Sequence, residues 1–314
     1  MIYVIIVTYN ATPWLTKCIV SLLKSSLPLR IIAVDNGSTD GTQQIIKEKY
    51  PEVVLLQSAE NLGFGKANNI GIKQAYEAGA NYVFLLNQDA WVEKDTIESL
   101  INIADKNPEY GIISPIHLNG KGDALDLRFS HCIAPNMCPK LVSDLLLNQT
   151  KYGVYETNFV NAAAWLMSRK CIETVGGFNP IFHMYGEDDN YIHRTHYHGL
   201  KVGIHPFAKI YHDRENRTEI ITKNTYKKNL KKSLLVKYSN PNLQNAISDE
   251  LKWAMKGIIK SIIKIDMKRF KDEQTRLNII KEIKANLELN TKISKQKGIN
   301  FLEHLPNYST KIPF

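Results

Sequence analysis

The chain has 314 residues, of which 44% are hydrophobic and 23% are charged, and its formal net charge is +9 at neutral pH. These values are typical of a soluble globular protein with one large domain and an appendage, or with two modest domains. No uninterrupted apolar run approaches the roughly 20 residues that a membrane-spanning helix needs, which excludes a protein that crosses a bilayer.

The first hundred residues predict four successive units of strand, loop and helix. Strands are expected at residues 2–7, 31–34, 53–57 and 82–86, and helices at 14–24 and 42–50, within 61–78, and from 95 to about 106. The strands are apolar without alternation, as in a parallel sheet that is buried on both faces. With right-handed crossovers, this order indicates a doubly wound α/β domain.

The N-terminus and the cysteines indicate the compartment. Residues 2–7 are interpreted as the first strand and not as a signal peptide, because they lack a basic region and a small-residue cleavage site. The four cysteines, Cys18, Cys132, Cys138 and Cys171, form no CxxC pair. We therefore interpret them as reduced thiols of a cytoplasmic protein.

The middle of the chain departs from the regular alternation. Residues 108–155 contain several prolines and glycines, and we expect an irregular region with short strands that covers the acceptor side. Further elements are predicted as a strand at 158–168, a short helix with a glycine stop at 170–178, a helix at 188–199 and a strand at 202–212.

Polar turns follow three of the predicted strands: Thr8-Tyr9-Asn10, Asp35-Asn36-Gly37-Ser38 and Asn87-Gln88-Asp89. In open α/β sheets, ligands bind in the crevice outside these strand ends. Asp35 could accept hydrogen bonds from a base or ribose, Lys66 and backbone N–H groups could donate to phosphate, and Asp89 could hold a hard divalent cation. Such residues also serve as helix N-caps, and we favour that simpler role for Asp40 and Thr42.

An acidic cluster, Glu187-Asp188-Asp189, opens the helix predicted at 188–199. The helix dipole stabilises an acidic charge there by about 0.3–1 kcal/mol, which explains one acid better than three. Adjacent like charges raise the pKa of at least one carboxyl group, which suits a general base. His212 ends the last predicted strand and could join Asp89 at the crevice, although a lone histidine there is more often structural.

Six segments occur in an order that resembles family 2 glycosyltransferases, most closely the bacterial rhamnosyltransferase-like branch. They are residues 7–10, 34–40, 61–71, 85–90, 176–178 and 184–189. The resemblance covers residues 1 to about 215. It implies a GT-A fold, which is a Rossmann-like mixed sheet flanked by helices. It also implies inverting transfer of a sugar from a nucleoside-diphosphate sugar to a hydroxyl of a glycan or lipid-linked glycan, in the assembly of bacterial surface polysaccharide.

The resemblance implies roles for single residues. Asp188 would be the catalytic base, and Asp89 with His212 would hold Mg²⁺ or Mn²⁺. The nucleotide-sugar would be bound by Thr8, Asn10, Asp35, Asn36, Lys66, Asn68, Asn87 and Glu187. In the DxD motif of the family, Asn87 replaces the first aspartate. An amide oxygen can still ligate a metal, but a strict metal dependence does not follow.

The C-terminal region is basic and mainly helical. Residues 215–314 contain 21 Lys/Arg and 10 Asp/Glu, a net charge of +11, whereas residues 1–214 carry a net charge of −2. We expect a catalytic domain at 1–215 and a helical extension at 216–314. The lysines at 252, 256, 260, 264 and 268 run beside an isoleucine-rich face. This pattern predicts docking on an anionic membrane, at the inner face of the cytoplasmic membrane.

Other readings of the sequence are left open. The segment 258–263 could instead pack on the catalytic domain, and nucleic acid is not expected as a partner because few aromatic residues interleave the basic stretch. Gly63-Phe64-Gly65 lacks the third glycine of an NAD site. A nucleotidyltransferase would need a glycine-rich, basic phosphate loop near the N-terminus. A non-catalytic sugar-binding subunit would not need both Asp89 and Asp188.

Overall fold

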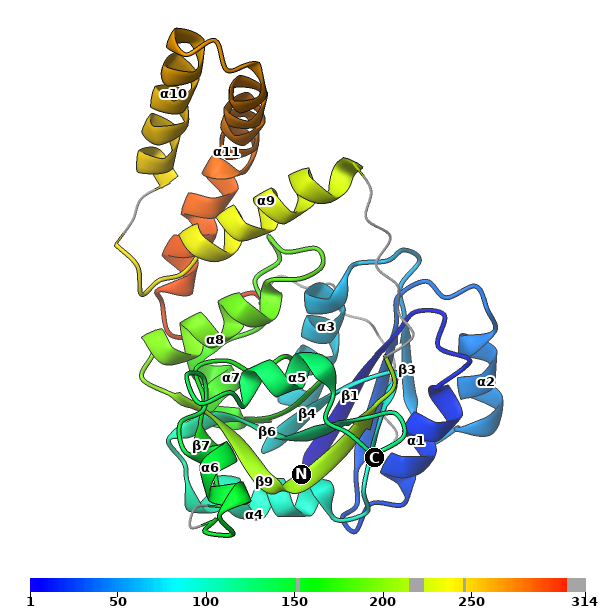
Figure 1. The fold of residues 1–314 in the computed structure, drawn as a ribbon. Helices are drawn as coiled ribbons and strands as arrows, with labels where there is room; N and C mark the ends of the chain where they lie inside the picture. The colour runs from blue at the N-terminus through cyan, green and yellow to red at the C-terminus, as the bar shows by residue number, and fades with distance from the viewer. Residues whose placement is uncertain (151–152, 215–222, 245–246, 304–314) are drawn as a thin grey trace.

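The protein is described in a computed structural model that covers residues 1–150, 153–214, 223–244 and 247–303. These residues form one nine-stranded sheet with helices on both faces and further helices beyond it (Figure 1). The strands are β1 Ile2–Thr8, β2 Arg30–Asp35, β3 Val54–Gln57, β4 Tyr82–Asn87, β5 Ala90–Val92, β6 Tyr110–Asn119, β7 Tyr155–Glu156, β8 Ala164–Ser168 and β9 Lys201–His212. The helices are α1 Leu15–Leu23, α2 Thr42–Lys49, α3 Phe64–Glu77, α4 Thr96–Lys106, α5 Leu127–Cys132, α6 Leu141–Leu146, α7 Arg169–Val175, α8 Glu187–Tyr197, α9 Lys223–Tyr238, α10 Ile247–Ile263 and α11 Met267–Ser294.

The strands follow the spatial order β3-β2-β1-β4-β8-β6-β9-β5, with β7 paired to β9. Strands β1 to β4 are parallel, and each is joined to the next by a helix, which confirms the four predicted units. Strand β8 is antiparallel to both β4 and β6, so the sheet as a whole is mixed. This arrangement confirms the fold class that the resemblance implies.

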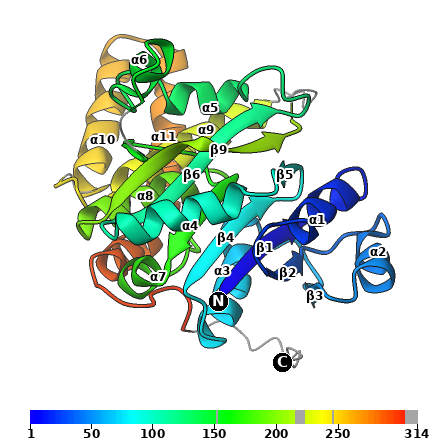
Figure 2. The same ribbon diagram turned by 90° about the horizontal axis from the view of Figure 1, so that it is seen from below.

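Both faces of the sheet are covered, which explains the unbroken apolar strands (Figure 2). In β1, Val4 and Ile6 belong to an apolar cluster with α1, α2 and α4, whereas Tyr3 and Ile5 belong to a second cluster with α3, α7 and α8. Helix α3 lies especially close to β1, because a Cβ atom at Gly71 would come within 2.6 Å of the Ile5 side chain. The two clusters fix the strand ends that carry the polar turns.

The expectation of an irregular region at 108–155 is wrong in its first part. Residues 110–119 form β6, a buried ten-residue strand in the middle of the sheet, between β8 and β9. Its register with β9 shifts between Pro115 and Ile116, where residues 206–208 of β9 bulge. A proline cannot donate a hydrogen bond to a neighbouring strand, but it is tolerated at such a bulge. Pro115 therefore led the sequence analysis to miss a central strand. The predicted strand at 158–168 is also shorter, since β8 covers only its end.

Helices α9, α10 and α11 form a helical arm. Helices α10 and α11 pack against each other as a hairpin that extends away from the sheet (Figure 1). The predicted domain boundary at 215/216 lies outside the described residues and stays a prediction. The expected single row of lysines is wrong, because α10 ends at Ile263 and α11 begins at Met267. Within the described ranges, no helix has the length and apolar character needed to span a membrane.

Candidate active site

The carboxyl ends of β1, β2 and β4 meet at one edge of the sheet. Thr8 is in register with Asp35, and Val7 is in register with Asn87. The Thr8 hydroxyl donates a 2.8 Å hydrogen bond to Asp35 Oδ2. The structure therefore brings together the strand ends at which the sequence predicts a ligand crevice.

The buried Asp35 carboxylate is held by donors that follow β2. Ser38 donates to it from its N–H (3.0 Å) and its hydroxyl (2.5 Å), and Gln43 Nε2 donates at 2.5 Å. The Ser38 hydroxyl accepts a 2.9 Å bond from the N–H of Asn10, which turns the chain after β1 with a φ of 51°. The sequence patterns did not assign roles to Ser38 and Gln43. A base or ribose that binds Asp35 would share the carboxylate with these donors.

Asn36 and Asn68, which the resemblance assigns to the nucleotide-sugar, form hydrogen bonds within the fold. The Asn36 side chain accepts from the N–H of Leu62 (2.9 Å) and donates to Gly63 O (3.2 Å), and it is buried. Asn68 is also buried and donates to Phe64 O (3.0 Å), one helical turn earlier in α3. Their contact with the nucleotide-sugar stays a prediction. Their visible role is to fix the loop before α3 and its first turn.

Lys66 lies half-buried in the first turn of α3, beside that loop. A Cβ atom at Gly65 would lie 3.5 Å from Glu187 Cβ and 3.0 Å from Phe178 Cβ. The start of α3 therefore packs against the start of α8. The N–H groups of a helix N-terminus and a nearby lysine form a favourable environment for phosphate.

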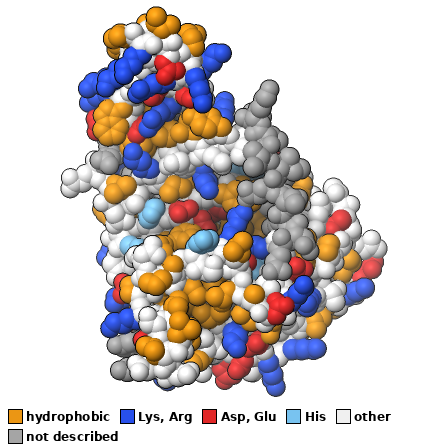
Figure 3. Space-filling view, viewed as in Figure 1, with side chains coloured by type: hydrophobic (Ala, Val, Ile, Leu, Met, Phe, Trp, Pro, Cys, Tyr) orange, Lys and Arg blue, Asp and Glu red, His pale blue; other side chains and the backbone are white. Residues whose placement is uncertain are grey.

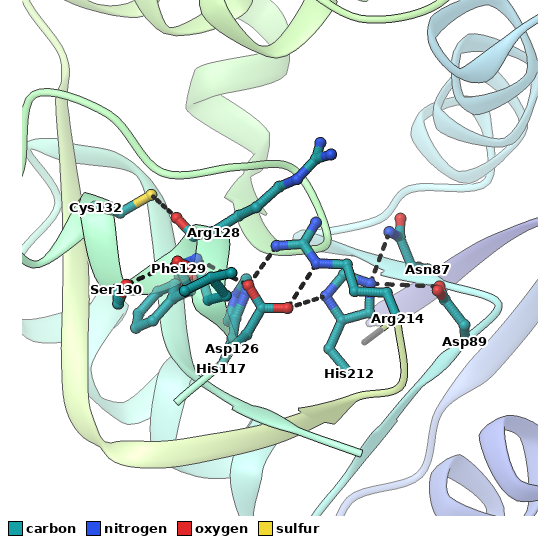
Figure 4. A network of polar contacts seen from close by, with 12 residues as sticks. Asn87, Asp89, His117, Asp126, Arg128, Phe129, Ser130, Cys132, His212 and Arg214 are labelled. Atoms are coloured by element: carbon teal, nitrogen blue, oxygen red, sulfur yellow. Dashed lines mark hydrogen bonds and ion pairs between the residues drawn. The ribbon is translucent and has the colours of Figure 1, made fainter. Parts of the chain in front are cut away.

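Asp89 and His212 lie side by side beyond the end of β4 (Figure 4). Strand β5 pairs with β9 so that Ala90 is opposite His212, which brings the histidine next to the carboxylate. His212 Nε2 is 3.4 Å from Asp89 Oδ1 and 3.4 Å from Asn87 Nδ2. Both Asp89 and His212 are only 1% exposed. The structure thus brings His212 next to Asn87 and Asp89, which lie more than a hundred positions earlier in the sequence.

Asp126 and Arg214 extend this group, and the sequence patterns identified neither. Asp126 Oδ2 is 3.5 Å from His212 Nδ1 and accepts from Arg214 Nε at 2.6 Å, while Oδ1 accepts from the N–H of Phe129 (2.8 Å) at the start of α5 (Figure 4). Burial raises the pKa of Asp126, but the Arg214 guanidinium and the Phe129 N–H outweigh burial and hold that pKa below its usual value. Asp126 is therefore a carboxylate that faces the second ring nitrogen of His212.

The three acids at 187–189 form the first turn of α8, after a tight turn in which Tyr185 and Gly186 have φ values of 68° and 99°. Burial, followed by repulsion from Asp188, raises the pKa of Glu187 to about 7. The same two causes raise the pKa of Asp189 to about 6. Burial also raises the pKa of Asp188 above its usual value. This turn therefore holds carboxyl groups that can exchange protons near neutral pH.

The α8 turn and the His212 group face a common region. Burial raises the pKa of the Cys132 thiol to about 11, and the charges of Asp188, Asp126 and Arg214 all act on it. Asp188, Asp126 and Arg214 therefore all lie in the neighbourhood of Cys132, the last residue of α5. Figure 3 shows acidic and histidine side chains in a recess of this face, below the helical arm.

Comparison with known proteins identifies the family. The model of glycosyl transferase family 2 matches residues 3–175, which is more than half of the chain. The chain belongs to glycosyl transferase family 2. It is thus a glycosyltransferase, which removes the nucleotidyltransferase and the non-catalytic subunit from the alternatives.

Similar proteins agree with this family assignment. The chain is 28% identical, over 235 residues, to N-acetylglucosaminyl-diphospho-decaprenol L-rhamnosyltransferase of Mycobacterium tuberculosis, covering 68% of this chain and 76% of that protein. It is 32% identical, over 132 residues, to UDP-N-acetylglucosamine–dolichyl-phosphate N-acetylglucosaminyltransferase of Methanococcus voltae, covering 37% and 52%.

Solved structures support the GT-A fold of this family 2 glycosyltransferase. The crystal structure of S. aureus TarS 1–349 in complex with UDP has a TM-score of 0.54 and 14% identity, covering 94% of this chain and 90% of that one. The complex of the same TarS fragment with UDP-GlcNAc has a TM-score of 0.55. At this identity, the likeness shows the fold and no more.

Enzymes of this family and fold commonly use a divalent metal, and the residues around Asp89 fit one. A carboxylate oxygen and an imidazole nitrogen 3.4 Å apart, beside an amide, are donors that Mg²⁺ or Mn²⁺ accepts. No group of three or more His, Cys, Asp or Glu in the described ranges forms a metal site by itself. The residues therefore fit a cation that shares its coordination with diphosphate oxygens and water, as Mg²⁺ commonly does in enzymes.

Proposed function

We propose that this family 2 glycosyltransferase transfers a sugar, with inversion, from a nucleoside-diphosphate sugar to a hydroxyl of a glycan or lipid-linked glycan. The observation that carries the proposal is the pair formed by Asp89 and His212 beyond the end of β4, at the sheet edge that also holds the Thr8–Asp35 group. With the acids of α8, these groups would provide suitable side chains for a nucleoside, a diphosphate and an acceptor hydroxyl.

In the proposed reaction, each group acts on one part of the substrates. Asp35, with Thr8 and Asn10, would bind the nucleoside, and Lys66 would bind the diphosphate. Asp89, His212 and Asn87 would hold Mg²⁺ or Mn²⁺, which supplies positive charge to the departing diphosphate. Asp188 would accept the proton of the acceptor hydroxyl as its oxygen attacks the anomeric carbon. Glu187, which is buried beside it, would line the sugar position.

The acceptor and the location are inferred from the relatives. The mycobacterial relative is named for N-acetylglucosaminyl-diphospho-decaprenol, and the archaeal relative is named for dolichyl phosphate. Both names describe substrates on a polyprenyl lipid. We therefore propose a lipid-linked glycan as acceptor, rhamnose as one candidate sugar, and a peripheral position on the inner face of the cytoplasmic membrane, in polysaccharide assembly.

The direct test is a panel of UDP-, dTDP- and GDP-sugars, incubated with the protein and Mn²⁺, with release of the nucleoside diphosphate as the signal. We expect one nucleotide to be released well above the others, and the release to increase when a polyprenyl-diphosphate-linked sugar is added. If no sugar of the panel yields nucleoside diphosphate with any acceptor, the proposed donor class is wrong.

The pH dependence provides a second test, through Lys232 of α9. The charge of Lys232 lowers the pKa of Asp188, against the larger effect of burial, and its Nζ lies 5.9 Å from the ring centroid of Tyr185. A base acts when deprotonated, so activity is lost as pH falls through the pKa of Asp188. In Lys232→Met that pKa is higher, and the acid limb of log kcat/KM should move to higher pH by less than about one pH unit.

Lys231→Met is the matched control, because Lys231 is the neighbouring lysine and pairs with Glu282 of α11 at 2.7 Å. Its acid limb should stay at the wild-type pH. If the acid limb of log kcat/KM moved equally in both variants, Asp188 would not be the titrating group.

A further inference from the structure

The free end of the α10–α11 hairpin exposes a cluster of large apolar side chains. The connection between the two helices includes Ile265 at a φ of 54°, a conformation that is costly for a β-branched residue. We define the hairpin tip as the exposed apolar residues of this end, with their exposed fractions: Ile259 (57%), Ile262 (61%), Ile263 (75%), Ile265 (84%) and Met267 (61%). Figures 1 and 3 show this end of the hairpin farthest from the sheet, with apolar side chains at its extremity.

The tip is exposed because α10 uses other residues to pack on α11. In the half of α10 nearer the tip, the buried positions are small ones, Ala254, Gly257 and Ser261, which recur on one face of the helix. A Cβ atom at Gly257 would come within 2.5 Å of the Glu273 carboxyl group, so the two helices approach closely there. The isoleucines are thereby left on the outer side. A contiguous exposed apolar cluster of this kind usually marks a contact surface.

The tip is surrounded by positive charge. Residues 252–271 contain seven Lys/Arg and one Asp, and all seven basic side chains are exposed. Among the residues that the structure describes, Lys256, Lys260 and Lys264 have no ion-pair partner. Each basic residue near an anionic lipid surface contributes a favourable interaction that salt weakens.

This combination favours a bilayer over other partners. Apolar side chains at an extremity with basic side chains around them match the interface of an anionic membrane, where the apolar part enters and the charges meet headgroups. A second copy of the chain would bring two sets of seven positive charges together, which repel each other. Single-stranded nucleic acid binds on aromatic side chains, and the tip has none.

The stem of the hairpin connects the tip rigidly to the active site. Glu250 of α10 is fully buried and bonds to Tyr238 of α9 and Arg276 of α11. These helices share an apolar cluster with Phe182, just before the acidic turn, and a Cβ atom at Gly186 would lie 2.8 Å from Val236 of α9. The arm therefore packs directly against the turn that precedes Asp188.

We propose that the hairpin tip inserts into an anionic lipid leaflet and anchors the catalytic domain at the membrane surface, with the acidic turn of α8 at the base of the arm. The inference rests on the proposed function and deepens it, since a sugar on a polyprenyl diphosphate would be presented at the same membrane surface. The sequence-based expectation was that a row of lysines on one helix contacts the membrane. Here the end of a hairpin makes the contact, and its apolar side chains are the part that inserts.

Vesicle binding of the full chain tests the proposal. We expect the protein to float with vesicles of phosphatidylcholine and phosphatidylglycerol (70:30), and binding to fall when salt is raised from 0.1 to 0.5 M. The variant Ile262→Ser/Ile263→Ser should bind at least tenfold more weakly. The matched control is Leu146→Ser/Leu147→Ser, which removes two exposed leucines near α6, far from the hairpin in Figure 1, and should bind like the wild type.

A second variant distinguishes insertion from adsorption. Ile262→Trp should show a blue-shifted emission on vesicles and quenching by brominated acyl chains, relative to the parent protein with its four native tryptophans. The proposal would be overturned if the double serine variant bound vesicles like the wild type, if the leucine control lost binding equally, or if brominated lipids did not quench the new tryptophan. It would also be overturned if the double serine variant changed self-association of the protein and not vesicle binding. Binding of UDP, dTDP and GDP without vesicles is measured in parallel. Absence of binding for all three would contradict the proposed function, whereas loss of vesicle binding with a nucleotide still bound would contradict only this inference.

Discussion

Asp188→Asn should abolish sugar transfer while nucleotide binding persists. The substitution keeps the size of the side chain and an oxygen that can still accept from the Asp189 N–H, a 2.9 Å bond in the wild type. It removes the ability to take a proton, and general-base assistance is typically worth 10²–10⁴-fold. We expect kcat to fall by about 10³-fold, with the dissociation constant of the nucleoside diphosphate within about twofold of wild type.

Asp189→Asn is the matched control for this experiment. It removes the same charge one residue further along the first turn of α8, where burial is the main cause that raises the pKa of the carboxyl group to about 6. Because Asp189 is not the proposed base, its variant should retain most of the activity. If Asp189→Asn were the inactive variant, or if Asp188→Asn lost nucleotide binding and kept turnover, the base would be misassigned.

The parts of the site that the sequence predicts are those carried by local motifs. Asp35 and Asp89 follow buried strands directly, and the parallel order of β1, β2 and β4 is enough to bring their ends to one edge. The acidic cluster that contains Asp188 is a local pattern as well, whereas the role of Asp188 as the base comes from the family resemblance and stays a prediction. Local signals of this kind can be recognised in a single sequence, since they depend only on neighbours along the chain.

Asp126 was missed because only long-range pairing gives it a role. It belongs to a stretch that the prolines suggest is irregular, and it approaches His212 through two pairings. The strand β6 runs parallel to β9, and the Asp126 N–H donates to His117 O at 2.9 Å after the chain turns back. Nothing at position 126 itself distinguishes this aspartate from a surface N-cap.

The break between α10 and α11 could have been predicted, and the isoleucine exposure could not. Asp266 is an N-cap whose side chain accepts from the Arg269 N–H at 2.9 Å, a signal that lies within the lysine row. Helical periodicity places Ile259 and Ile262 on one face, but it does not say whether that face meets protein or solvent. The small residues at 254, 257 and 261 decide this, because they let α11 occupy the other face.

Asp126→Asn should weaken Mn²⁺ binding by about 10- to 100-fold, the usual effect of removing a carboxylate that supports a metal-ligating histidine. Asp126 Oδ2 lies 3.5 Å from His212 Nδ1, so its charge favours an imidazole that carries a proton on Nδ1 and directs Nε2 toward Asp89. Asparagine keeps an oxygen for the Phe129 N–H that caps α5. The fold should therefore persist while the orienting charge is lost.

The measurement is titration of the protein with Mn²⁺ alone, followed by the electron paramagnetic resonance signal of the free ion, with thermal unfolding as a test of folding. The control is Asp123→Asn, which removes an exposed carboxylate from the same loop. This carboxylate accepts a 2.7 Å hydrogen bond from the Asn119 side chain and is not paired with His212. We expect the control to bind Mn²⁺ like the wild type. Equal affinity in Asp126→Asn and wild type would mean that His212 does not depend on Asp126, whereas equal loss in both variants would indicate a general effect of charge.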